Sequence, residues 1–101
     1  NNKMNMQQML IQAQKMQREM QKEQEALGKK EFQVSKNGIV TVKMMGTREL
    51  VAIEIADAGL DKEDKEFLEL SIKEAINECL NQIEEANEAI QAKMANRIPG
   101  F

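Results

Sequence analysis

The sequence predicts an α+β domain in which a long helix is followed by a three-stranded antiparallel β-meander and a second long helix. Three successive patterns of apolar residues support this. Apolar residues recur every three or four positions near the N-terminus, every second position in the middle and again every three or four positions towards the C-terminus. These patterns follow one another without a linker or an internal repeat, so residues 1–101 are expected to form a single domain.

The first helix is expected within residues 1–28. Its apolar positions between Met4 and Leu27 form a narrow, methionine-rich stripe that is typical of a coiled-coil seam, and only Glu23 interrupts it. Such a stripe packs in a core or a dimer interface, or serves as an adaptable groove for several partners. Gly28 is expected to end the helix, because glycine is common just after the last helical turn.

Residues 31–56 alternate between apolar and polar side chains and are rich in β-branched residues, which favours three strands. Asn37-Gly38 is the strongest short signal for a type I′ hairpin, since both central residues of that turn need positive φ. Gly46-Thr47 marks a second turn. Strands joined by such short turns are antiparallel, and the alternation predicts one buried and one more polar face.

The second helix is expected over residues 61–96, followed by a short tail at 97–101. Asp61 is suited to cap its N-terminus, because an aspartate side chain accepts hydrogen bonds from the first free backbone N–H groups. Cys79 lies on the apolar stripe of this helix. We expect it to act as a small core residue rather than as a reactive thiol.

The helices are longer than the sheet that they must cover. The two predicted helices would be about 36 and 52 Å long, whereas a strand of six or seven residues spans about 20 to 23 Å. The overhanging apolar stripes and two open sheet edges need another surface, so we expect a homodimer with projecting helical arms. The candidate interface residues are Val40, Val42, Ile53, Ile72, Ile76, Leu80 and Ile83.

The composition argues against an enzyme. The chain has no His and a single Cys, which removes the usual nucleophile pairs, zinc ligand sets and an internal disulfide. Its five glycines are isolated and form no phosphate-binding loop. We therefore expect no cofactor, no metal and no small-molecule substrate. No apolar run is long enough to span a bilayer and no signal-peptide core is visible, so we expect no membrane partner and a cytoplasmic location.

The charge is unevenly distributed along the chain. The net charge is −3, yet residues 1–30 carry a surplus of three positive charges and residues 61–101 a surplus of five negative ones. Lys15, Arg18 and Lys22 step three and four positions along the helix face opposite the methionine stripe, and Lys29 and Lys30 follow. In a dimer, two such faces could contact a phosphate backbone. The alternative is an ordinary solubilising face with ion pairs inside the helix.

Several short segments, in order and spacing, resemble the YbaB/EbfC nucleoid-associated proteins of bacteria. They are Gln12–Gln17 with Met20-Gln21, Asn37–Val42 leading to Met45-Gly46, Leu50–Ile55, Asp64–Glu66 with Leu68–Leu70, Ala75–Glu78 and Pro99–Phe101. The resemblance covers nearly the whole chain. It implies a tweezer-like cytoplasmic homodimer of the nucleoid, whose projecting helices bind duplex DNA with little sequence preference and modulate gene expression.

These expectations lead to one function and one alternative. The first is a non-enzymatic protein that contacts the phosphates of double-stranded DNA through Lys15, Arg18 and Lys22, with Lys29 and Lys30 as secondary contacts. The alternative is an adaptor whose methionine- and glutamine-rich helix docks against a helix of another protein, with no direct role in DNA binding.

Overall fold

The computed structural model describes residues 5–97. The elements are α1 Met6–Lys29, β1 Glu31–Lys36, β2 Val40–Met45, β3 Leu50–Ile55, two 3₁₀ turns at Asp57–Gly59 and Lys62–Asp64, and α2 Lys65–Ala95. This order confirms the predicted α+β class. The first four residues of the expected N-terminal helix and residues 98–101 of the expected tail lie outside the described residues.

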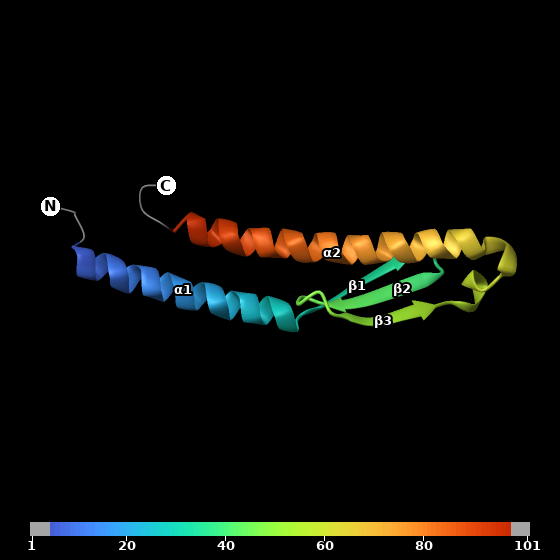
Figure 1. Cartoon of the computed structure of the whole chain (residues 1–101), viewed down its shortest axis with the longest axis horizontal. Coiled ribbons are helices and arrows are strands. Elements are labelled where there is room, and N and C mark those ends of the chain that lie inside the picture. The colour runs from blue at the N-terminus through green and yellow to red at the C-terminus, as the bar shows by residue number, and fades with distance from the viewer. Residues whose placement is uncertain (1–4, 98–101) are drawn as a thin grey trace.

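The chain is long and thin, with extents of 73 × 21 × 14 Å. Figure 1 shows the first half of α2 lying across the sheet, while its second half runs beside α1 in the opposite direction. The start of α1 and the end of α2 therefore lie at the same end of the molecule. Within residues 5–97, neither helix is both long and apolar enough to cross a bilayer.

The sheet has the predicted meander topology, with β2 between β1 and β3 and both pairs antiparallel. Asn37 and Gly38 have φ values of 54° and 68°, as the type I′ turn requires. The second turn is also where the sequence placed it, but there Arg48 takes the left-handed conformation with φ of 73°. This role of Arg48 is not visible in the sequence, because glycine or asparagine is the usual residue in that conformation.

The core lies between α2 and the first two strands. Its buried residues are Phe32, Val34, Val40, Val42 and Met44 of the sheet and Ala75, Cys79 and Ile83 of α2. The paired register places Ile53 and Ile55 of β3 opposite Val42 and Val40, on the same face of the sheet. However, α2 packs on β1 and β2, so Ile53 and Ile55 remain 40% and 39% exposed.

Both helices begin later than the periodicity indicated, because capping side chains determine the first turn. The Asn5 side chain accepts a hydrogen bond from Gln8 N at 2.8 Å, and the Gln8 side chain accepts one from Asn5 N at 3.2 Å, so α1 starts at Met6. Asp61 does accept from a backbone N–H, that of Glu63 at 3.1 Å. It caps a 3₁₀ turn, however, and α2 starts only at Lys65.

Gly28 does not end α1 as expected. The helix continues to Lys29 and stops because Lys30 is extended, with its N–H donating to Leu27 O at 3.1 Å. The glycine required here is Gly46, in the β2–β3 turn. A Cβ on Gly46 would lie 1.8 Å from Leu27 O, and Gly46 N donates to Lys30 O at 2.8 Å. The end of α1 is therefore held directly against the turn.

Gly46→Ala is expected to destabilise the fold more than Gly38→Ala. The added methyl group of Gly46→Ala meets rigid backbone, whereas Gly38 has open space and only its positive φ opposes a side chain, at about 1 kcal/mol. Urea unfolding should show a loss for Gly46→Ala of more than about 2 kcal/mol. Equal losses for the two variants would contradict the proposed close contact.

Cys79 is expected to be unreactive in the folded protein. Its side chain is fully buried, burial raises the pKa of the thiol, and Sγ lies 3.8 Å from the carbonyl oxygen of Val42. Since the thiolate is the reactive form, a chromogenic disulfide reagent should react with Cys79 only at the rate of unfolding, and rapidly in denaturant. Rapid reaction in native buffer would show that the core opens.

Candidate nucleic-acid interface

The outer face of α1 carries a row of exposed cations. Lys15, Arg18, Lys22 and Lys29, here called the basic stripe, are all exposed. At 100° per residue they fall within about 60° of one another around the helix axis, and they extend over about 21 Å of its length. Among residues 5–97 none of the four makes an ion pair within 4.0 Å. The stripe is therefore available to an external anion.

Lys30 does not belong to this stripe. It is the extended residue after the last helical turn, and its Nζ lies 5.0 Å from the centre of the Phe32 ring. At that distance the ammonium group gains a cation–π interaction with the ring. The five predicted contact residues are thus divided by the structure into four on one helix face and one at the start of β1.

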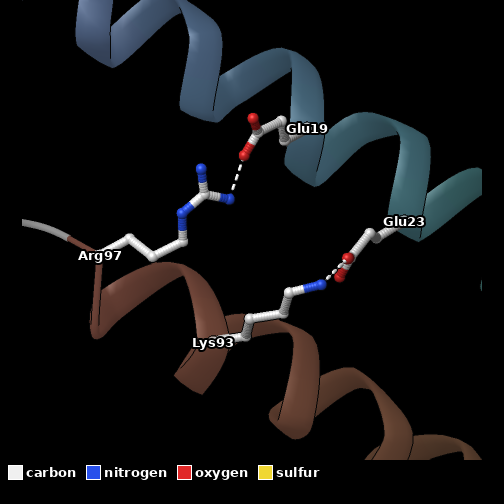
Figure 2. A network of polar contacts seen from close by, with 4 residues as sticks. All are labelled: Glu19, Glu23, Lys93 and Arg97. Carbon is white, nitrogen blue, oxygen red and sulfur yellow. Dashed lines mark hydrogen bonds and ion pairs between the residues drawn. The ribbon is translucent and has the colours of Figure 1, made fainter.

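The carboxylates of α1 mostly face the other helix. Figure 2 shows Glu19 paired with Arg97 and Glu23 paired with Lys93, both cations coming from the end of α2. The residue after Glu23 also contacts α2: Gln24 Nε2 donates to Asn87 Oδ1 at 2.8 Å. Glu19 and Glu23 are half-buried, so they face the interhelical contact.

Glu19 remains charged in this arrangement. The hydrogen bond from Arg97 lowers the pKa of the Glu19 carboxyl group below its ordinary value, although partial desolvation opposes the shift, and the positive charges of Lys15 and Lys93 lower it further. The alternative of ion pairs inside the first helix is not what Glu19 and Glu23 form, since they pair with Arg97 and Lys93. Glu25 is the one carboxylate of α1, within the described residues, that has no such partner.

Cations on the sheet side are neutralised by neighbouring acids. The ion pairs are Lys36–Glu78, Lys43–Glu54 and Arg48–Glu84. The hydrogen bonds that Lys36 donates to Glu78 and Lys43 donates to Glu54 raise the pKa values of the two lysines. Lys62, Lys65 and Lys73 are exposed just before α2 and in its first three turns, but acidic residues alternate with them along the chain. Of the described surface, the outer face of α1 has the clearest positive surplus.

The outer face of α2 has the opposite sign. Glu74, Glu85 and Glu88 are exposed, and no described residue forms an ion pair with them. At 100° per residue these three residues lie at least 140° around α2 from the fully buried Ile83, so they are on the side of α2 away from the core. The paired helices are thus positive along α1 and negative along α2.

The candidate dimer residues divide into two groups by their exposure in the single chain. Three are buried in its own core and leave no surface for a partner: Val40, Val42 and Ile83. Four remain accessible, with Ile53 exposed and the others half-buried: Ile53, Ile72, Ile76 and Leu80.

The accessible residues lie along one side of the molecule. Ile72, Ile76 and Leu80 recur every four residues on α2, and Glu84 continues the row. Glu84 pairs with Arg48 in the β2–β3 turn at 2.9 Å, so the row runs along the side of α2 nearest β3. Together with the uncovered face of β3 it forms an apolar strip, defined here as Ile53, Ile55, Ile72, Ile76 and Leu80.

Sequence reasoning missed two features of this surface. Lys93 and Arg97 were not recognised as partners of α1, although the interruption of the apolar stripe by Glu23 was a signal that a cation must lie opposite it. The exposure of Leu60, Phe67 and Leu70 near the start of α2 was also missed, because periodicity identifies an apolar face without showing whether anything covers it.

Comparison with known proteins gives this surface a context. Residues 2–98 match the YbaB/EbfC DNA-binding family. A nucleoid-associated protein of Mycoplasmopsis pulmonis is 41% identical over 93 residues, which cover 92% of each chain. One of Enterococcus faecalis is 41% identical over 98 residues, covering 96% of this chain and 94% of the relative.

The fold has a counterpart among solved structures. The crystal structure of an uncharacterized protein from Helicobacter pylori superposes with a TM-score of 0.76 at 26% identity, covering 92% of this chain and 99% of the other. The family match spans both helices and the sheet, and it agrees with the resemblance found in the sequence. The chain belongs to the YbaB/EbfC DNA-binding family.

Proposed function

We propose that this protein is a nucleoid-associated DNA-binding protein that acts as a homodimer and contacts duplex phosphates through the basic stripe, with little dependence on base sequence. The main support is the stripe itself: four exposed cations lie on one helix face, while two of the three described carboxylates of α1 pair with α2. Lysine and arginine on phosphates give affinity without reading bases. Membership of a DNA-binding family supports the same function.

The dimensions of the stripe suit a duplex. A length of about 21 Å corresponds to about six base-pair steps of 3.4 Å, so several phosphates lie within reach of one helix. The only aromatic residues are three phenylalanines. Phe32 is buried, and Phe67 is far from the stripe, near the start of α2. Among residues 5–97, the stripe therefore lacks the stacking platforms on which proteins bind single strands.

The triple variant Lys15→Gln, Arg18→Gln, Lys22→Gln is expected to lose more than about tenfold in affinity for two unrelated duplexes. The slope of log K against log salt should fall by about 0.9 for each cation that contacts a phosphate. A fluorescence anisotropy titration at several salt concentrations measures both quantities.

The matched control is Lys62→Gln, Lys65→Gln, Lys73→Gln, which removes the same number of charges from exposed positions at the other end of α2. If both triple variants lose affinity equally, the protein responds to total charge and not to the stripe. Loss for one duplex only would indicate base readout instead of phosphate contact.

A homodimer through the apolar strip would cover side chains that the single chain leaves open. Ile53→Asp places a charge in the middle of the strip and is expected to shift sedimentation from twice the chain mass of 11.5 kDa towards that mass. Leu10→Asp is the control, because Leu10 is 58% exposed on the first turns of α1, away from the strip. A wild-type protein that sediments at 11.5 kDa at micromolar concentration would rule out the dimer.

An adaptor role remains the second candidate because the start of α1 is apolar and uncovered. Met6, Met9, Leu10 and Ile11 are 54 to 86% exposed, and such a surface suits a partner helix. The DNA titration separates the two functions. An adaptor would show no duplex binding at physiological salt, and its partner would remain bound after nuclease treatment.

A further inference from the structure

We propose that Lys93 and Arg97 tune the affinity of α1 for DNA without touching it, by neutralising the two carboxylates that α1 carries beside its basic stripe. The inference rests on the proposed function and adds two positioning residues, one in the last turn of α2 and one just after it, to the contact residues on α1.

The carboxylates in question are close neighbours of the stripe. Glu19 follows Arg18 directly and lies one turn after Lys15, and Glu23 follows Lys22 directly. If they were unpaired, the four cations of the stripe would share α1 with three carboxylates and leave a surplus of one positive charge. With Arg97 on Glu19 and Lys93 on Glu23, Glu25 remains as the single opposing charge and the surplus is three.

Both ion pairs lie on the side of α1 that faces α2. Figure 2 shows both cations reaching α1 from the α2 side, with the carboxylates between the helices. Lys93 and Arg97 therefore meet α1 at the two carboxylates and not at the cations of the stripe. An exposed ion pair adds little to stability, because solvent screens it and two long side chains must be ordered. Breaking such a pair still changes the electrostatic potential at the stripe, because the unpaired charge would lie a few ångströms from the contact residues and within one Debye length.

Two reciprocal double variants break the same ion pairs and change the charge in opposite directions. Lys93→Gln with Arg97→Gln leaves both carboxylates unpaired and is expected to weaken duplex binding by about three- to tenfold. Glu19→Gln with Glu23→Gln leaves both cations unpaired and is expected to tighten it by a similar factor. If the pairs only hold the helices together, both variants should weaken binding, and that result would overturn the proposal.

A quadruple variant that combines Lys93→Gln and Arg97→Gln with Glu19→Gln and Glu23→Gln distinguishes neutralisation of the carboxylates from direct contact with DNA. Neutralisation predicts that its affinity and salt slope return to those of the wild type. Direct contact of Lys93 and Arg97 with phosphates predicts that its salt slope stays lower, by about 0.9 for each lost contact. A lower slope would therefore reject the positioning role.

Lys36→Gln and Glu78→Gln provide the matched control. They break a comparable ion pair at the sheet, distant from the stripe, and each should change duplex affinity by less than about twofold. Changes as large as those of the reciprocal variants would show that any charge has this effect and would overturn the proposal.

Elution from immobilised heparin measures the same surface without DNA. The first reciprocal variant should elute at lower salt than the wild type, and the second at higher salt. The heparin experiment tests the inference separately from the proposed function. A wild-type protein that binds heparin but no duplex would refute DNA binding. The order in which the variants elute would still test the role of Lys93 and Arg97. The same elution salt for both variants would overturn that role.

Discussion

The mismatch in length between α2 and the sheet is the constraint on which the rest of the structure depends. A helix of 31 residues is about 46 Å long, whereas a six-residue strand spans about 20 Å. The sheet can cover only the first half of α2, from Ser71 to Ile83. The second half needs another partner, and α1 supplies it. The close contact between Gly46 and Leu27 holds the C-terminal end of α1 against the β2–β3 turn, and this places the rest of α1 beside α2.

This arrangement also determines the distribution of charge. Since the two helices run in opposite directions, the C-terminus of α2 lies beside the middle of α1, where Glu19 and Glu23 are. Cations are favourable at that end of a helix because they interact with its unpaired carbonyl groups. Lys93 and Arg97 therefore suit both the end of α2 and the carboxylates of α1. Because the helices pair in this way, two of the three carboxylates of α1 are occupied by cations from the end of α2.

The sequence was sufficient to predict what depends on local patterns. The α+β order, the meander, the Asn37-Gly38 turn and the buried place of Cys79 all follow from periodicity and turn chemistry. Features that depend on contacts between distant segments could not be read in this way. Gly28 is a residue type common at helix ends, so the sequence favoured it as the end of α1. The contact that excludes a side chain is instead made by Gly46, which lies 19 residues from Leu27 in the sequence.

The same limit applies to the candidate site. The spacing of Lys15, Arg18 and Lys22 indicated one exposed face, and the structure places all three there. The spacing could not show that Glu19 and Glu23 face a different helix, because an isolated helix would allow them to pair with their own lysines. Likewise, Val42 and Ile83 have the apolar character of interface residues, but α2 and the sheet bury them against each other within one chain.

Net charge is a poor guide to what such a molecule can bind. The chain carries a net charge of −3, but its acidic residues are concentrated on α2, one helix away from the stripe. Two packed helices measure about 20 Å across, while the Debye length at physiological salt is about 8 Å. A phosphate held against α1 is therefore attracted by charges a few ångströms away and is largely screened from Glu85 and Glu88. In the proposed function, the local surplus on α1 and the pairing of its carboxylates matter more for binding to DNA than the net charge of the chain.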